Sequence, residues 1–293
     1  MRLDRRQAIA GILALAGCGQ ASEQLRVAAS AVSTFSILAD FTVQLLGNAN
    51  EIQSLVGPDA DAHVFDPSPS HAALVSQASV VIENGLGFEP WSSRLREAAS
   101  YSGKVVVASE HIVPILFEQT PDPHAWQDAT NARQYVRNIA TGLSEVFPAQ
   151  AEAIRTRAAK YDLELEVLDR DIRTLIDSVP PDRRVIVTSH DAFSYFGRAY
   201  GVRFLAPIGL NTEEDPSPTK MRALIEQIRR ERVTALFIEN MSDGRLLQAI
   251  AEETGVRIGG KLYSDALSAP GGEASTYLNM MRFNSYSMAR TMA

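Results

Sequence analysis

Short runs of β-branched and other apolar residues, bounded by polar residues or glycine, recur along the chain and predict buried strands. The runs form two groups, the first at residues 25–29, 52–56, 79–83 and 104–108, and the second at residues 184–189, 202–206, 233–239 and 256–263. Helical patterns lie between them, for example at residues 68–77, 91–99 and 219–231. Strands that alternate with helices predict parallel sheets covered on both faces, and so an α/β protein with two (β/α)4-like domains.

The segment between the two groups has a different pattern. Residues 149–178 contain no glycine or proline, and their apolar positions recur in alternating steps of four and three. These positions are Ile154, Ala158, Tyr161, Leu165, Leu168, Ile172 and Leu175. They share one face of a helix, and about 30 helical residues span about 45 Å, enough to run along both domains. A surface helix or a coiled-coil seam would share the pattern, but its single copy and the flanking strands favour one long rigid link.

Chain length agrees with a two-domain organisation, because about 275 residues follow the signal-like N-terminus and exceed the usual size of one domain. The predicted parts are a signal peptide at 1–17, a tether at 18–24, an N-terminal α/β domain at 25–148, a backbone helix at 149–178 and a C-terminal α/β domain at 179–293.

The N-terminus has the parts of a secretion signal. Three arginines within the first six residues precede an apolar run at residues 8–16. Residues 15–18, Leu-Ala-Gly-Cys, resemble a bacterial lipobox, so we predict that Cys18 is the lipid attachment point. An ordinary signal with a chance cysteine is the alternative, and the pair Arg5-Arg6 leaves the twin-arginine export route open. Cys18 is the only cysteine, so the fold is expected to be stable without a disulfide.

Charge narrows the set of partners. The formal net charge is −7, and loss of residues 1–17, with three arginines and one aspartate, would leave −9. An acidic surface argues against a nucleic-acid partner and against broad adhesion to anionic lipid. No later apolar stretch approaches the length of a membrane span. We therefore expect a periplasmic or otherwise extracytoplasmic monomer, held at the membrane by its lipid anchor only.

Candidate metal ligands follow the predicted strands in both domains. His63 follows the second strand, His124 follows the fourth, His190 ends the fifth, and Asp265 follows the eighth. Parallel sheets bind ligands beyond the carboxyl ends of their strands. Three imidazoles and one carboxylate suit a first-row divalent metal. Two ligands from each domain would place that metal in the cleft between the domains.

The surroundings of the second histidine support this interpretation. Pro123 and Trp126 would restrict its loop and exclude water, and Asp122 or Asp128 would accept a hydrogen bond from an imidazole N–H. The two other histidines are predicted to be surface residues outside the metal site: His71 and His111.

Five motifs carry a resemblance to a known family. They are residues 56–59 (Val-Gly-Pro-Asp) before His63, residues 83–89 (Glu-Asn-Gly-Leu-Gly-Phe-Glu) before Trp91, residues 122–126 (Asp-Pro-His-Ala-Trp), residues 190–193 (His-Asp-Ala-Phe) with Tyr195 and Phe196, and residues 263–267 (Tyr-Ser-Asp-Ala-Leu). Over nearly all of its mature length the chain resembles the metal-specific solute-binding proteins of ABC importers, the zinc/manganese cluster with a rigid helical backbone. The resemblance implies a metal on His63, His124, His190 and Asp265, an ABC permease as partner and no enzymatic activity.

The resemblance also bears on which metal is carried. Members with glutamate at the third ligand position resemble manganese carriers, whereas histidine goes with zinc or with mixed behaviour, and this chain has His190. Many zinc members have a histidine-rich loop before the second ligand, but residues 117–123 contain no histidine. The protein therefore takes zinc without that loop, for example from a periplasmic metallochaperone, or its metal is not zinc. Because three imidazoles and one carboxylate suit zinc best, we expect Zn²⁺ as the transported ligand, with Mn²⁺ or Fe²⁺ second.

Two other classes of protein fit the sequence less well than a metal carrier does. A zinc hydrolase would need an open fourth position, which Asp265 is expected to close, and the sequence lacks the HExxH and GxSxG motifs of hydrolases. The segment Gly85-Leu86-Gly87 faintly resembles a dinucleotide loop, but a structural turn explains it better. An adhesin or structural lipoprotein would leave the four candidate ligands unexplained.

Overall fold

The computed structural model describes residues 31–117, 119–213 and 216–293. The first lobe is built on a parallel sheet in the order β2-β1-β3-β4. Its strands are β1 (Ala31–Phe35), β2 (Ile52–Val56), β3 (Val80–Glu83) and β4 (Lys104–Val107). The expected strand at 25–29 lies outside the described residues, and the first strand of the sheet comes later in the chain.

The second lobe repeats this plan with a parallel sheet in the order β10-β9-β7-β8. Its strands are β7 (Val185–Val187), β8 (Arg203–Leu205), β9 (Ala235–Glu239) and β10 (Ile258–Leu262). The inner strands β1 and β7 are buried along their whole length, as expected for strands covered on both faces. The predicted α/β class with two four-stranded parallel sheets is confirmed. The domain boundaries given above stay a prediction.

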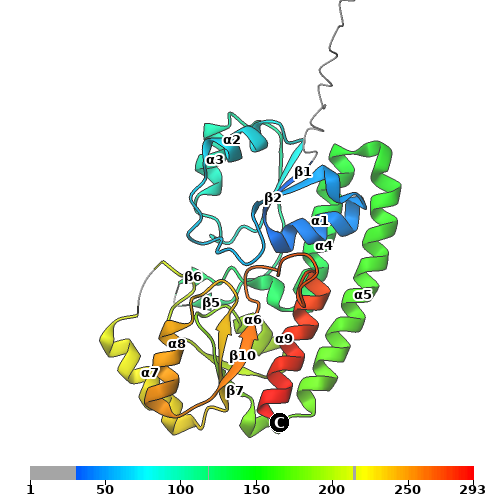
Figure 1. Ribbon diagram of the computed structural model, residues 1–293. Coiled ribbons are helices and arrows are strands. Elements are labelled where there is room, and N and C mark those ends of the chain that lie inside the picture. The colour runs from blue at the N-terminus through cyan, green and yellow to red at the C-terminus, as the bar shows by residue number, and fades with distance from the viewer. Residues whose placement is uncertain (1–30, 118, 214–215) are drawn as a thin grey trace, which may run out of the picture.

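Helices cover both sheets (Figure 1). They are α1 (Ser36–Leu46), α2 (Pro69–Ser76), α3 (Ser92–Ala98), α4 (Ala129–Val146), α5 (Ala151–Asp177), α6 (Ser194–Tyr200), α7 (Pro218–Glu231), α8 (Arg245–Thr254) and α9 (Tyr277–Met292). Short 3₁₀ helices lie at Ala49–Glu51, Ala125–Gln127, Pro148–Gln150 and Pro181–Arg183, and β5 (Leu116–Phe117) pairs antiparallel with β6 (Thr120–Pro121). None of the helices in the described ranges is long and apolar enough to cross a membrane.

The predicted link between the lobes is α5, a helix of 27 residues that runs beside both of them (Figure 1). It begins after the 3₁₀ turn Pro148–Gln150, slightly later than the sequence pattern suggested. Its buried face consists of Ile154, Tyr161, Leu165, Leu168, Ile172 and Ile176. Helices α4 and α9 pack along α5, so the link is a layer of three helices rather than one isolated helix.

One apolar core extends from the first lobe, across this helical layer, into the second lobe. It contains Phe35 of β1, Tyr161 of α5, Phe196 of α6 and Tyr277 of α9, all nearly inaccessible to solvent. Close-packed interiors transmit strain and resist shear, so a core shared between the lobes holds them in one arrangement.

Candidate metal centre

The structure brings His63, His124, His190 and Asp265 together between the two lobes. Each has one ligand atom in a group whose members lie within 4.8 Å of one another. All four side chains are buried, with exposed fractions of 4% for His63, 1% for His190 and 0% for the other two. His63 follows β2, His124 follows β4 and the β5–β6 hairpin, His190 follows β7, and Asp265 follows β10. The carboxyl ends of strands in both lobes therefore bring all four side chains together, as predicted.

The three imidazoles present the same ring nitrogen to the centre of the group. The Nε2 atom of His124 lies 3.3 Å from Nε2 of His63 and 3.4 Å from Nε2 of His190. Oxygen Oδ2 of Asp265 lies 3.1 Å from Nε2 of His190 and 3.4 Å from Nε2 of His63, and Oδ1 lies 3.7 Å from Nε2 of His124. Donor atoms this close from four side chains can together surround one cation.

Both oxygens of Asp265 are buried, and the polar side-chain atoms that face them are the imidazole Nε2 atoms of the three histidines. A buried carboxylate is costly unless positive charge lies beside it, and a metal ion between Asp265 and the imidazoles would supply that charge. Because the two oxygens face different imidazoles, the carboxylate can offer both of them to one metal ion.

Asp122 fixes the orientation of His124. Its Oδ1 accepts a hydrogen bond of 2.9 Å from the backbone N–H of His124 and lies 2.8 Å from the ring Nδ1. A proton on Nδ1 leaves Nε2 free as a donor to metal. Of the two carboxylates considered from the sequence, Asp122 is therefore the one that contacts the imidazole. Asp128 instead caps α4, where its Oδ1 accepts a 2.8 Å hydrogen bond from the backbone N–H of Thr130.

His190 has a corresponding carboxylate, which the sequence analysis missed. Glu239 ends β9, is fully buried, and places Oε2 2.6 Å from Nδ1 of His190. Its Oε1 accepts a 2.9 Å hydrogen bond from the backbone N–H of the same histidine. A glutamate at a strand end was the available signal, but it became meaningful only when the sheet order placed β9 next to β7.

Aromatic rings enclose the first-lobe side of the site. The ring centroid of Phe88 lies 4.6 Å from that of His63, and the ring of Trp126 lies 5.4 Å from that of His124. Phe88 follows Gly85-Leu86-Gly87, whose φ angles of 83°, 55° and 82° are all left-handed. The segment is thus a structural turn, as predicted, and it presents an apolar wall that excludes water from the imidazoles.

The metal-free site has strongly shifted pKa values. Burial opposes ionisation of Asp265, but the imidazoles of His190 and His124 hold its pKa well below the usual range. Burial also opposes a charge on His190, yet the carboxylates of Glu239 and Asp265 raise its pKa well above the usual value. For His63 burial prevails and lowers the pKa. One proton is thus concentrated on His190, where a metal ion would have to replace it.

Neither of the two other histidines joins the site. His111 is exposed, as predicted, and has a left-handed φ of 67°. His71 is half-buried rather than at the surface, because it completes the N-terminal cap of α2, where its Nδ1 accepts a 2.9 Å hydrogen bond from the backbone N–H of Ser68.

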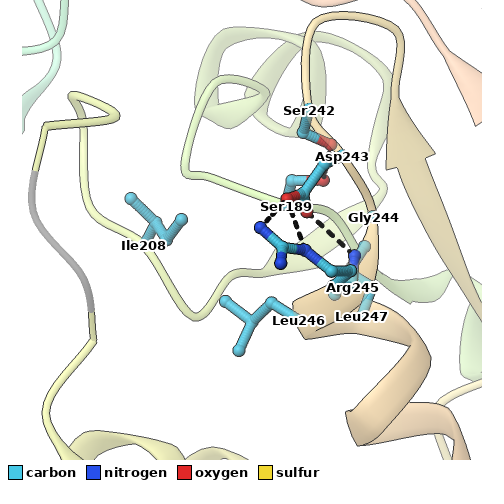
Figure 2. Close-up of a pocket in the computed structure, with 8 residues that line it drawn as sticks. All are labelled: Ser189, Ile208, Ser242, Asp243, Gly244, Arg245, Leu246 and Leu247. Atoms are coloured by element: carbon cyan, nitrogen blue, oxygen red, sulfur yellow. Dashed lines mark hydrogen bonds and ion pairs between the residues drawn. The ribbon is translucent and has the colours of Figure 1, made fainter.

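A separate pocket of about 420 Å³ lies beside the site in the second lobe (Figure 2). It is lined by Ser189, Ile208, Ser242, Asp243, Gly244, Arg245, Leu246 and Leu247. Its only charged side chains pair with each other, since Nε of Arg245 lies 2.7 Å from Oδ2 of Asp243. The pocket contains none of the four candidate ligands and is distinct from the metal centre.

Comparison with known proteins agrees with this geometry. The chain matches the family model described as "Zinc-uptake complex component A periplasmic" over residues 31–291. It belongs to this family. The chain is thus a non-enzymatic, metal-binding solute-binding protein of an ABC transporter, acts outside the cytoplasm, and is not a zinc hydrolase.

Individual relatives have similar length but differ in the metal that their names carry. The manganese ABC transporter substrate-binding lipoprotein PsaA of Streptococcus mitis is 30% identical, and the match covers 89% of this chain and 88% of PsaA. The manganese-binding lipoprotein MntA of Halalkalibacterium halodurans is 32% identical, with 93% and 92% covered. The solved structure of the periplasmic zinc-binding protein TroA from Treponema pallidum aligns with a TM-score of 0.86 at 28% identity, covering 90% of this chain and 98% of TroA.

These matches establish a carrier of divalent metal but do not support the expectation of zinc in particular. The expectation of zinc rested on a four-coordinate site in which Asp265 supplies one donor. In the structure both of its carboxylate oxygens face the imidazoles, so the site can offer five donors, and a count of four no longer argues for zinc.

Proposed function

We propose that His63, His124, His190 and Asp265 hold one Mn²⁺ ion, which the protein captures outside the cytoplasm and delivers to the permease of an ABC importer. The observation that carries this proposal is the convergence of both Asp265 oxygens and three imidazole Nε2 atoms in one buried site. The manganese binding named for the relatives PsaA and MntA supports it.

The number and type of the donor atoms favour manganese. Three imidazoles and a bidentate carboxylate offer five donors, three nitrogens and two oxygens. Mn²⁺ prefers more ligands and more oxygen than Zn²⁺, which is satisfied by four donors. A site with five converging donors suits manganese without rejecting zinc.

Zinc is the second candidate, favoured by the three imidazole ligands and by the zinc named for TroA. The Irving–Williams order gives zinc the higher affinity at a nitrogen-rich site, so a manganese carrier of this kind would depend on metal availability outside the cytoplasm. Fe²⁺ lies between the two in that order.

The experiment is a metal-binding measurement coupled to transport. Stripped protein should bind one Mn²⁺ per chain when zinc is excluded, and should exchange it for Zn²⁺ when both are supplied. Cells without the gene should accumulate less manganese and keep their zinc content. Loss of zinc accumulation alone would identify zinc as the cargo, whereas absence of any stoichiometric metal binding would refute the proposed site.

The membrane attachment follows from the N-terminus. Cys18 lies outside the described residues, and we propose that it is the lipid attachment point after removal of residues 1–17. Residues 18–24 would then tether the folded lobes close to the permease, with the protein acting as a monomer. The lipoproteins named among the relatives support this arrangement.

The short segment before His124 contains no histidine that could collect zinc. If the cargo is zinc, we propose that a periplasmic metallochaperone transfers it directly to this protein.

A further inference from the structure

We infer that Glu239 determines metal affinity and selectivity at the site without binding the metal itself. The inference rests on the proposed function and goes beyond it, because Glu239 is not among the four ligands. The carboxylate of Glu239 ends β9 and is fully buried. In the described part of the chain, no lysine or arginine forms an ion pair with it, and His190 is the one basic side chain that it contacts.

The position of Glu239 in the sheet explains how one side chain can influence two ligands. Strand β9 lies between β10 and β7, and the chain leaves these neighbours toward Asp265 and His190, respectively. Glu239 therefore stands at the carboxyl end of the sheet, between the two second-lobe segments that carry ligands.

Contacts reach from Glu239 to both segments. On one side it accepts the 2.9 Å hydrogen bond from the backbone N–H of His190, and its Oε2 lies 2.6 Å from the ring Nδ1. On the other side Oε2 accepts a 2.5 Å hydrogen bond from the hydroxyl of Ser264, the residue before Asp265. The carboxylate thus fixes both the rotation of the His190 ring and the start of the Asp265 segment.

The negative charge has a further effect on the metal. When metal is bound, a carboxylate at Nδ1 holds the remaining ring proton there, leaves Nε2 as the metal ligand and makes the imidazole a stronger donor. In a buried site the charge also acts on the cation through a low effective dielectric. Bonds to manganese are more ionic than bonds to zinc, so removing this charge should weaken manganese binding more than zinc binding.

Glu239→Gln keeps the shape of the side chain and removes its charge. Loss of such an outer partner typically reduces metal affinity by about 10- to 100-fold. We expect a reduction of this size for Mn²⁺ and a smaller one for Zn²⁺, measured by competition titration. The Co²⁺-loaded variant should also show a changed visible absorption spectrum, because the ligand field of Co²⁺ depends on how strongly the His190 imidazole donates.

Glu83→Gln is a matched control, since Glu83 ends β3 in the first lobe as Glu239 ends β9 in the second. Glu83 accepts a 2.8 Å hydrogen bond from Ser92 and lies 3.5 Å from Nε of Arg96, away from the ligands. The same substitution there should leave both affinities and the Co²⁺ spectrum unchanged. Thermal unfolding of the metal-free variants shows whether each is folded.

The outcomes separate this inference from the proposed function. If the wild-type protein binds no metal, the proposed site fails. If the wild type binds metal and Glu239→Gln binds Mn²⁺ and Zn²⁺ as tightly as Glu83→Gln does, the inference about Glu239 is wrong and the ligand assignment stands. Equal losses for both metals would refute the selectivity role. Should Glu239→Gln fail to fold, Glu239→Asp retracts the carboxylate from His190, and wild-type affinity in that variant would also overturn the inference.

Discussion

The indole Nε1 of Trp126 donates a hydrogen bond of 3.0 Å to the carbonyl oxygen of Ser264. Trp126 follows the first-lobe candidate ligand His124 by two residues, and Ser264 directly precedes the second-lobe candidate ligand Asp265. The same carbonyl accepts a 2.8 Å hydrogen bond from the side-chain amide of Gln127. Two buried donors from one lobe therefore fix the segment that carries a ligand from the other.

This connection, together with the shared layer of α4, α5 and α9, predicts that metal binding causes only a small change in overall shape. A wide hinge motion would have to break buried hydrogen bonds and separate a continuous core. Small-angle X-ray scattering of stripped and loaded protein should give nearly equal radii of gyration. A large decrease on loading would contradict the rigid arrangement.

Substitution of His190 tests the third ligand. His190→Ala should weaken Mn²⁺ and Zn²⁺ binding by at least about 100-fold, since loss of a ligand should cost no less than loss of an outer partner. His190→Glu provides two nitrogens and two carboxylates, so zinc should lose affinity while manganese loses less. Isothermal titration calorimetry of the three proteins measures this. Equal zinc affinity in all of them would exclude His190 as a ligand.

Metal binding should depend on pH because the raised pKa of His190 keeps a proton on the metal-free site. Glu239 and Asp265 raise that pKa against the effect of burial, so the proton is still bound above the ordinary value of 6.5. Metal must displace this proton, so the apparent affinity for metal should fall as pH decreases. The decrease should be about tenfold per pH unit for each proton released, and it should begin near neutral pH. Calorimetry in buffers of different ionisation enthalpy counts the protons. Release of none at neutral pH would contradict a protonated His190.

Glu89 should make the metal-free protein less stable as pH rises. Burial raises the pKa of Glu89 to about 7 from an ordinary value of 4.5, although Thr34 and the backbone N–H of Asn84 each donate a 2.6 Å hydrogen bond to it. The native state then holds a proton that the unfolded chain loses near pH 4.5. Stability from this group is complete below that pH and is lost as pH approaches 7, by up to about 3 kcal/mol.

Urea unfolding of metal-free wild type and Glu89→Gln at pH 5 and pH 8 tests this expectation. The variant should lose less stability than the wild type between the two values, because its amide does not titrate. Other groups titrate equally in both proteins. If wild type and variant lose the same free energy of unfolding between pH 5 and pH 8, Glu89 is already ionised at pH 5 and the prediction is wrong.

Cys18→Ala should move the protein from the membrane fraction to the soluble extracytoplasmic fraction, because the lipid anchor would have no attachment point. Metal affinity should not change, since the lobes that carry the ligands are untouched. Cell fractionation shows where each protein is found, and competition titration measures its metal affinity. Recovery of wild-type protein in the soluble fraction would refute the anchor.

Periodicity was sufficient to predict the two sheets and the convergence of the four candidate ligands, because strand ends of parallel sheets meet at one edge. It did not predict β1 at its described position. Ser33 and Thr34 make that strand look polar, yet both are buried, and their hydroxyls are satisfied by Thr42 and Glu89. The partners of α5 were missed for a related reason: an apolar helical face shows that something covers it, but not which helix. Glu239 needed the strand order before its role could be seen.

The helical layer that joins the lobes also affects the lifetime of the loaded state. Without a wide hinge, water can reach a bound ion only when the ligand segments themselves loosen, and two of those segments are tied together by Trp126, Gln127 and Ser264. Spontaneous loss of metal then requires local unfolding, whose frequency depends on the free energy of opening these bonds. We therefore expect the dissociation rate to depend on a few buried hydrogen bonds, so that a permease that competes for those same bonds would release the ion without moving the lobes apart.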